Sequence, residues 1–429
     1  MTLTTPAPAG LADPKSEPPA RLGWLDALRG FAALTVVCFH VSPLVLGTDR
    51  HLAIYRHIDF GKYGVLLFFL VSGYVIPMSL ERHGSLRTFW VGRLLRIYPA
   101  YLATIALVTF LAVVGAGGFP AWVHTDPLTG VLAHVSMMSD PLGVRGMVRV
   151  FWTLAYEMTF YLIVAGLFAW RLHRHTGWWA AGLALLALAG PELPDGLFAA
   201  HLTIAATGLL VLMVAAVAAG MTGRHRLAGL FGLAFVLVPI VNAHPGRGST
   251  VVASWEGVLL LAVMFAGTVV YRTQHRQLGR WAAGLSLLVV VDCLVGAHAA
   301  YGNGPVWVAT VGAVGLTFAG AFALRRRSVP RVLTWLGTIS YSLYLLHVPV
   351  LGQLTRLVPH VADRPVGERI GFGLVFLVIS GAVAALSQRW IELPAQDFGR
   401  RILRRRRARI TTQRAVPGTG RGENAPRSV

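Results

Sequence analysis

The sequence predicts an all-α protein, a polytopic transmembrane helix bundle of ten to twelve spans with both termini cytoplasmic. Hydrophobic residues make up 55% of the 429 residues and charged residues only 13%, which is far from the composition of soluble domains. The apolar residues come in blocks of about 17 to 25, the length that crosses a bilayer. The connections between these blocks alternate between rich and poor in arginine, which indicates their orientation.

The apolar windows define twelve predicted spans, of which the fifth and seventh are the shortest. They lie near residues 24–45, 62–80, 98–116, 151–170, 177–192, 198–220, 227–243, 251–271, 279–298, 305–324, 331–357 and 369–392. Every second connection carries more arginine than its neighbours, so both ends of the chain are expected in the cytoplasm. The same count and orientation also suit many transporters.

Composition divides the chain into three parts. Residues 1–23 are rich in proline and predict a disordered cytoplasmic N-terminal tail, residues 24–392 form the membrane domain, and residues 393–429 predict a basic, disordered cytoplasmic tail with no further folded domain expected after it. The net charge of +20 lies mainly in turns and in this tail, so it is interpreted as an orientation signal and no nucleic-acid partner is expected.

Cysteine and lysine usage are also informative. Cys38 and Cys293 both fall within predicted spans, and no span contains a close pair of metal ligands, so neither a structural disulfide nor a metal site is expected. We find only two lysines against abundant arginine, alanine and glycine. This usage suggests a high-GC bacterial genome, and hence a multi-pass protein of the bacterial cytoplasmic (inner) membrane.

The first span carries two polar side chains that its apolar surroundings do not explain. Arg29 and His40 are eleven residues apart, which places them on nearly the same helix face and about 16 Å apart along the axis. Arg29 lies near the inner end and His40 in the outer half. Arg29 either extends to the lipid headgroups or requires an anionic partner, for which Asp26 is the candidate.

Two other predicted spans place polar groups in the same outer half. Glu157 lies in the fourth span with Tyr161 one turn further on, and the eleventh span contains Tyr344 and His347. A carboxylate and two histidines at one depth are suited to general acid and base catalysis, in which Glu157 orients the His40 imidazole. They are equally suited to a proton relay in a transporter.

Arginines also gather near the predicted cytoplasmic surface. The stretch 86–97 alternates arginine with large apolar residues and predicts an interfacial amphipathic helix, after which Pro99 opens the third span. Arg93 and Arg96 are three residues apart, so their guanidinium groups are expected to face the same way. Such a pair suits phosphate groups, although contact with anionic lipid explains it as well.

Other polar positions point to packing. Ser72 and Gly73 are interpreted as a close-packing point, and Glu256 and Asp292, which also fall within spans, as sites of helix-to-helix hydrogen bonds. The nucleotide-binding glycine loops, the zinc motif His-Glu-x-x-His and the serine motif Gly-x-Ser-x-Gly are not found.

Taken together, the ordered motifs resemble those of the acyltransferase 3 family, the bacterial integral membrane O-acyltransferases. The matching segments are Leu-Asp-Ala-Leu-Arg-Gly at 25–30 with an Arg-x10-His spacing to His40, Phe-Phe-Leu-Val-Ser-Gly-Tyr at 68–74, Arg-Leu-Leu-Arg-Ile-Tyr-Pro at 93–99, Trp-Thr-Leu at 152–154 leading to Glu157, and Ile-Ser-Tyr-Ser-Leu-Tyr-Leu-Leu-His-Val-Pro at 339–349. Residues from about 172 to 331 show only generic apolar helices.

The resemblance implies that residues 24–392 are a membrane acyltransferase domain that moves an acyl group, usually acetyl from acetyl-CoA, to a hydroxyl of a carbohydrate or glycosylated metabolite. His40 would be the central catalytic residue with Arg29 as its partner, and Arg93 and Arg96, with Arg29, would bind the acyl-CoA. Glu157 would be the acid of the segment that begins at Trp152. The positions expected to support these residues are Asp26, Trp152, Tyr161, Tyr344 and His347.

The implied chemistry is compatible with the predicted topology. The pantetheine arm of CoA, on the order of 15 to 20 Å, is comparable to the distance of about 16 Å between Arg29 and His40. His40 would deprotonate the acceptor hydroxyl, which approaches from the outer side, while Glu157 either orients His40 or acts on the leaving group. An acyl-histidine intermediate is the variant. A proton-coupled membrane exporter is the competing interpretation from another class, and a lipid-organising function is a third.

Overall fold

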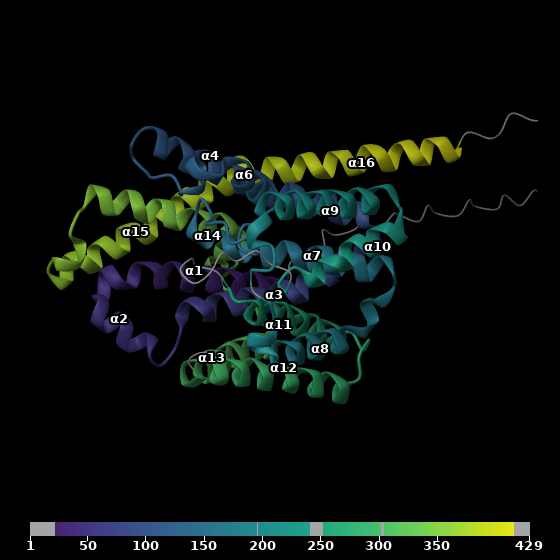
Figure 1. The fold of residues 1–429 in the computed structure, drawn as a ribbon, viewed down its shortest axis with the longest axis horizontal. Coiled ribbons are helices and arrows are strands. Elements are labelled where there is room, and N and C mark those ends of the chain that lie inside the picture. The colour runs from purple at the N-terminus through teal and green to yellow at the C-terminus, as the bar shows by residue number, and fades with distance from the viewer. Residues whose placement is uncertain (1–21, 195, 241–251, 302–303, 416–429) are drawn as a thin grey trace, which may run out of the picture.

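The computed structural model describes residues 22–194, 196–240, 252–301 and 304–415 (Figure 1). Their regular structure is entirely helical, and no strand occurs in these ranges, which confirms the all-α class. The predicted N-terminal tail lies outside the described residues as far as position 21. The α-helices are α1 (Gly23–Leu46), α2 (Thr48–Tyr55), α3 (Phe60–His83), α4 (Leu86–Val113), α5 (Trp122–Thr125), α6 (Pro127–Val135), α7 (Trp152–Ala169), α8 (Thr176–Ala187), α9 (Leu202–Thr222), α10 (His225–Ala234), α11 (Ser254–Gln274), α12 (Arg280–Tyr301), α13 (Gly304–Ala323), α14 (Arg331–Leu357), α15 (Val366–Ser387) and α16 (Leu393–Ala415).

The number of candidate spans is close to the lower end of the prediction. Among the described residues, nine helices are long and apolar enough to cross a membrane, and α14, although it has 27 residues, is not one of the nine. The fifth and seventh predicted spans are wrong, because they form α8 and α10 with only 12 and 10 residues, whereas a span needs about 20. The chain is an integral membrane protein.

The predicted boundary at Pro99 is also wrong. Residues 86–97 do not form a separate interfacial helix but are the first turns of α4, which continues through Pro99 to Val113. The charged segment needs no water interface of its own because Arg93 is buried in the protein. A proline inside a membrane helix is tolerated where neighbouring groups take up the freed backbone carbonyl.

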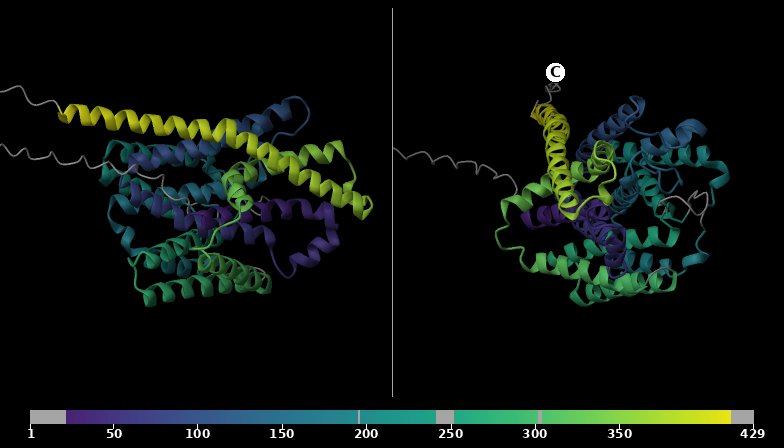
Figure 2. Two further views of the ribbon diagram at one scale, coloured as in Figure 1. Left: turned by 180° about the vertical axis from the view of Figure 1, so that it is seen from behind. Right: turned by 90° about the vertical axis from the view of Figure 1, so that its left-hand side faces the viewer.

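The beginning of the predicted C-terminal tail is helical and not disordered. A π-helical turn at Gln388–Glu392 joins α15 to α16, and α16 packs against α4. Arginine is a strong helix former, so a high density of positive charge did not prevent a helix here. Figure 2 shows α16 running along the outside of the bundle and past its end. Residues 416–429 lie outside the described part of the chain.

Close glycine contacts hold the centre of the bundle together. Helix α1 packs against both α14 and α3, and α3 packs against α11. A Cβ at Gly30 of α1 would lie 2.6 Å from the backbone nitrogen of Gly337 in α14, and a Cβ at Gly73 of α3 would overlap the carbonyl oxygen of Met264. Small residues of this kind let helix backbones approach closely in membranes. The predicted packing role of Gly73 is therefore confirmed.

Candidate active site

One face of α1 lines three cavities in succession. Arg29 lines the first, Ala32 and Val36 the second, and Val36 and His40 the third. These positions are three or four residues apart, so they form one stripe along the helix. We call the three spaces the arginine cavity, the passage and the histidine cavity. Their order along α1 agrees with the predicted separation of Arg29 and His40.

The arginine cavity has a volume of about 520 Å³ and is lined by Arg29, Arg82 and Arg96, which come from α1, α3 and α4. Asp26 and Glu392 also line it. The ion pairs formed by the described residues do not include one between Arg29 and Asp26. Three guanidinium groups around one space suit a ligand with several negative charges.

Arg29 is directed into the protein. Its residue is only 7% exposed, and its Cζ atom lies 5.3 Å from the centroid of the Phe68 ring. An arginine that extended to the lipid headgroups would not be enclosed in this way. Its Nε atom is buried and has no hydrogen-bond partner, so the site is left with an unused donor.

Arg93 and Arg96 do not face the same space. Arg96 lines the arginine cavity, whereas Arg93 is 6% exposed and its Cζ lies 5.7 Å from the Phe89 ring and 5.5 Å from the Tyr161 ring. Contacts with aromatic faces stabilise a buried guanidinium. The buried Nη1 of Arg93 also has no hydrogen-bond partner.

These unpaired N–H groups fit the phosphate and carbonyl oxygens of an acyl-CoA. A buried N–H group without a partner costs about 1 to 3 kcal/mol, and a ligand oxygen would remove that cost. Arg29 and Arg93 each retain such a group, and Arg96 and Arg82 supply further charge at the cavity. The residues present are therefore compatible with acyl-CoA, the predicted acyl donor.

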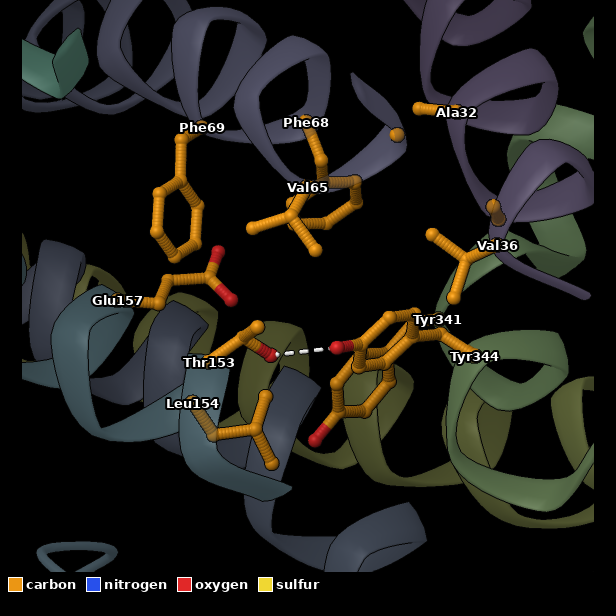
Figure 3. A pocket seen from close by; sticks show the side chains of 12 residues that line it. Ala32, Val36, Val65, Phe68, Phe69, Thr153, Leu154, Glu157, Tyr341 and Tyr344 are labelled. Atoms are coloured by element: carbon orange, nitrogen blue, oxygen red, sulfur yellow. Dashed lines mark hydrogen bonds between the residues drawn. The ribbon is translucent and has the colours of Figure 1, made fainter. Parts of the chain in front are cut away.

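The passage is narrow and mostly apolar (Figure 3). Its volume of about 20 Å³ holds roughly one water molecule. The rings of Phe68 and Tyr344 stack across it, with their centroids 6.4 Å apart and an interplanar angle of 15°. Val36, Val65 and Tyr344 line both the passage and the histidine cavity, so the two spaces are neighbours.

Glu157 lies in the wall of the passage (Figure 3). It accepts hydrogen bonds from the Tyr161 hydroxyl and, at 3.4 Å, from Ser72 Oγ. Among the described residues its side chain makes no hydrogen bond to His40, so the predicted orientation of the imidazole by Glu157 is not what the structure shows. Through Tyr161, Glu157 is connected instead to the guanidinium of Arg93.

His40 contacts a second histidine instead of Glu157. Nε2 of His347 lies 3.2 Å from Nδ1 of His40. Each Nδ1 also lies close to a backbone carbonyl one turn earlier, 2.9 Å from Val36 for His40 and 3.1 Å from Leu343 for His347. Because a carbonyl only accepts, both Nδ1 atoms carry the proton in the neutral rings. Nε2 is therefore the basic nitrogen of His40, as general-base catalysis requires.

The histidine cavity, of about 470 Å³, contains an ion pair that confirms the predicted helix-to-helix hydrogen bond of Glu256, although its partner, Lys62, was not predicted. Lys62 of α3 and Glu256 of α11 bind one another across 194 positions of sequence. The only signal was that Glu256 is a carboxylate and Lys62 a rare lysine, each at the end of a predicted span.

The predicted supporting residues lie in three places. Trp152 and Tyr344 line the histidine cavity, where the Tyr344 hydroxyl is held by Thr153 Oγ1 at 2.9 Å (Figure 3) and His347 contacts His40. Tyr161 lies with Glu157 and Arg93. Asp26 lines the arginine cavity.

Comparisons with known proteins agree with these features. A family model described as an acyltransferase domain (Acyl_transf_3) matches residues 22–388. Acyltransferase MdmB of Streptomyces mycarofaciens is 31% identical over 182 residues, 40% of this chain and 46% of that protein. The putative peptidoglycan O-acetyltransferase YrhL of Bacillus subtilis is 24% identical over 413 residues, covering 89% of this chain and 56% of that protein.

Peptidoglycan O-acetyltransferase OatA of Listeria monocytogenes is 23% identical over 405 residues, covering 87% of this chain and 56% of that protein. The chain thus spans about half the length of the curated relatives it matches. No solved structure matches it.

Proposed function

Because the chain belongs to the acyltransferase 3 family, we propose that it is an integral membrane O-acyltransferase that moves an acetyl group from acetyl-CoA to a hydroxyl of a carbohydrate or glycosylated small molecule. The observation that carries this proposal is the series of three cavities along α1, with arginines at one end and the basic Nε2 of His40 at the other. This arrangement supports two substrates that meet from opposite sides.

The donor would bind in the arginine cavity. Arg29, Arg82 and Arg96 line it and would hold the phosphates of CoA, while the pantetheine arm would have to widen the passage, which has a volume of about 20 Å³, to reach His40. The arm is on the order of 15 to 20 Å, close to the rise of about 16 Å from Arg29 to His40. CoA is cytosolic, so we assign the arginine cavity to the cytoplasmic side of the bacterial inner membrane.

The acceptor would bind in the histidine cavity. His40 Nε2 takes the proton of the acceptor hydroxyl as its oxygen attacks the thioester carbon, a C–O bond forms, and the C–S bond breaks. The electron pair of that bond leaves with the CoA sulfur, and the proton on His40 then passes to the thiolate or to water. In the variant path His40 Nε2 itself attacks the thioester, and the acyl-histidine is then attacked by the acceptor.

Two residues are assigned to positioning. The Nδ1–H group of His40 is shared between the Val36 carbonyl and Nε2 of His347, which both accept from it, so Nε2 of His40 stays available. Glu157 holds Tyr161, whose ring faces Arg93, so Glu157 acts at the donor end. Both assignments follow from the contacts described above and involve no contact with the reacting atoms.

The test uses the full chain purified in lipid nanodiscs. We expect release of the free CoA thiol from acetyl-CoA when a hydroxyl acceptor is added, and a mass gain of one acetyl group on the acceptor. A proton-coupled exporter would instead move solute across proteoliposomes without consuming acetyl-CoA. Such flux without thiol release would overturn the proposal.

The width of the passage bears on the exporter alternative. The passage, with room for about one water, is too narrow in this conformation for a sugar ring.

A further inference from the structure

One ion pair in the histidine cavity has no part in the mechanism above. Lys62 lies in the first turn of α3 and Glu256 in the first turn of α11, and the two form an ion pair. The Lys62 side chain is 25% exposed and that of Glu256 is 16% exposed. Both line the histidine cavity together with His40, so both are within reach of a molecule that binds there.

A second ion pair between the same two helices shows what a purely structural pair looks like. Arg272 of α11 is 3% exposed in its side chain and pairs with Glu81 of α3. Its Nε donates to Thr176 and its Nη1 to Gln277, each at 2.8 Å. Each of the three guanidinium nitrogens thus donates one hydrogen bond, and the pair lines a different cavity.

Lys62 differs because it keeps unused donors. Within the described ranges its ammonium group donates to Glu256 alone, and an ammonium has three N–H groups. The same nitrogen lies 5.0 Å from the centroid of the Trp152 ring. Trp152 also lines the cavity, so an aromatic face, an ammonium group and a carboxylate meet on one wall.

The charges around this cavity balance. Lys62 and Arg149 are its cationic lining residues, and Asp59 and Glu256 are its anionic ones. Part of the Asp59 carboxylate is used to cap α3, where it accepts from the backbone nitrogen of Lys62 at 2.9 Å. A cavity with two charges of each sign has no net attraction for an ion, but it offers donors and acceptors to a neutral molecule.

We propose that Lys62, Glu256 and Trp152 form the acceptor-binding wall of the histidine cavity and select an uncharged ring that carries several hydroxyl groups. Lys62 donates to one ring hydroxyl, Glu256 accepts from another, and the apolar face of the ring packs on Trp152. This deepens the proposed function, on which it rests, by assigning the residues that determine which acceptor is bound.

The experiment measures binding in the absence of any acyl donor. The full chain in nanodiscs is titrated with three methyl glycosides of one size: glucoside, which is neutral, glucuronide, which is anionic, and glucosaminide, which is cationic. The unmodified protein is expected to bind the glucoside best. Glu256→Gln leaves the cavity with an excess positive charge and should shift the ratio of dissociation constants toward the glucuronide by roughly tenfold.

Removing the positive charge of the pair should shift the ratio of dissociation constants in the opposite direction. Lys62→Met leaves an excess negative charge and should shift the ratio toward the glucosaminide by roughly tenfold. The double variant Lys62→Met with Glu256→Leu restores the balance without leaving a buried unpaired charge, so it guards against misfolding. It should weaken binding of all three glycosides without changing their order.

The matched control removes the other ion pair between α3 and α11. Glu81→Gln and Arg272→Met should leave the order of the three glycosides unchanged, because that pair lies outside the histidine cavity. The proposal is wrong if both single variants of the acceptor wall shift selectivity in the same direction, if the control variants shift it equally, or if the unmodified protein binds none of the glycosides. Thiol release from acetyl-CoA, measured separately, tests the proposed function, so the two failures are distinguishable.

Discussion

Nε2 of His347 lies 3.2 Å from Nδ1 of His40, although the two residues are 307 positions apart. The contact depends on the close crossing of α1 and α14. At this crossing a Cβ on Gly337 would overlap the carbonyl oxygen of Asp26, and one on Gly30 would lie 2.6 Å from the nitrogen of Gly337. Two glycines near one end of these helices thereby determine how the two histidines meet near the other.

Replacing His40 by alanine should lower kcat for acyl transfer by about 10² to 10⁴-fold, the range that general-base catalysis contributes. The dissociation constant for acetyl-CoA should not change, because the arginine cavity lies on the other side of the passage. Thiol release and equilibrium binding of acetyl-CoA measure the two quantities. Full activity in His40→Ala would show that another residue is the base.

Replacing His347 distinguishes positioning from packing. His347→Gln retains an acceptor for Nδ1–H of His40, and His347→Leu retains the volume but not the acceptor. We expect His347→Leu to lower kcat by roughly tenfold, the value of one hydrogen bond to a reacting group, with KM for both substrates unchanged. His347→Gln should recover most of that loss. Equal losses in both variants would indicate that His347 serves only to fill space.

The donor site is tested by Arg82→Ala combined with Arg96→Ala, because both arginines line the arginine cavity. Hydrogen bonds to charged groups contribute about 1.5 to 3 kcal/mol each, so the dissociation constant for acetyl-CoA should rise by at least roughly tenfold. The matched control truncates Arg224 and Arg226, which are exposed and lie on neither cavity. An unchanged dissociation constant in the Arg82 and Arg96 variant would remove both residues from the donor site.

The close contact of α1 with α14 at Gly30 and Gly337 leads to a prediction about stability. Gly337→Ala should lower the free energy of unfolding by about 1 to 3 kcal/mol, the usual cost of overpacking, and should reduce activity by separating α1 from α14. Gly312→Ala is the control, since a Cβ there meets nothing within 4 Å. Thermal unfolding and thiol release should change together in the first variant and in neither respect in the second.

The connection between α6 and α7 contains a carboxyl that makes stability depend on pH. Burial raises the pKa of Asp140 to about 7, although the Tyr156 hydroxyl donates to it at 3.0 Å. In the unfolded chain the group titrates near 4, so between about pH 4 and 7 the folded state binds more protons. The stability that protonated Asp140 contributes is complete below about pH 4, and it is lost as the pH rises to about 7.

Asp140→Asn should remove this dependence while keeping an acceptor for Tyr156. The variant should unfold at a higher temperature than the unmodified chain at pH 8, and the difference should shrink at pH 5. Parallel melting curves for the two proteins across this range would contradict the assignment of the slope to Asp140.

The sequence was informative where one helix carried the pattern. Arg29 and His40 lie in a single helix, so the period of 3.6 residues was enough to place them on one face and to estimate their separation. Depth along a helix does not give its rotation, however. Glu157 and His40 were expected to meet because they share a depth, but the face of α7 that carries Glu157 and Tyr161 turns toward Ser72 of α3.

Contacts between distant helices were beyond the reach of local patterns. The pairing of Lys62 with Glu256 depends on how α3 packs on α11, and that packing depends on the close approach of Gly73 to Met264. The prediction of a helix boundary at Pro99 was wrong for a related reason. A proline usually ends or kinks a helix, but membrane helices tolerate proline where neighbouring groups pair with the freed carbonyl, and α4 continues through Pro99.

The three cavities share α1 as a common wall, and this has a consequence for how such a protein diverges. Under the proposed function, a substitution that shifts α1 would alter the acyl-CoA site and the acceptor site at once. A change of acceptor preference alone is then expected from lining residues on other helices, such as Tyr55 of α2, Lys62 of α3 and Glu256 of α11. These three positions are the place to begin a search for variants with a different acceptor.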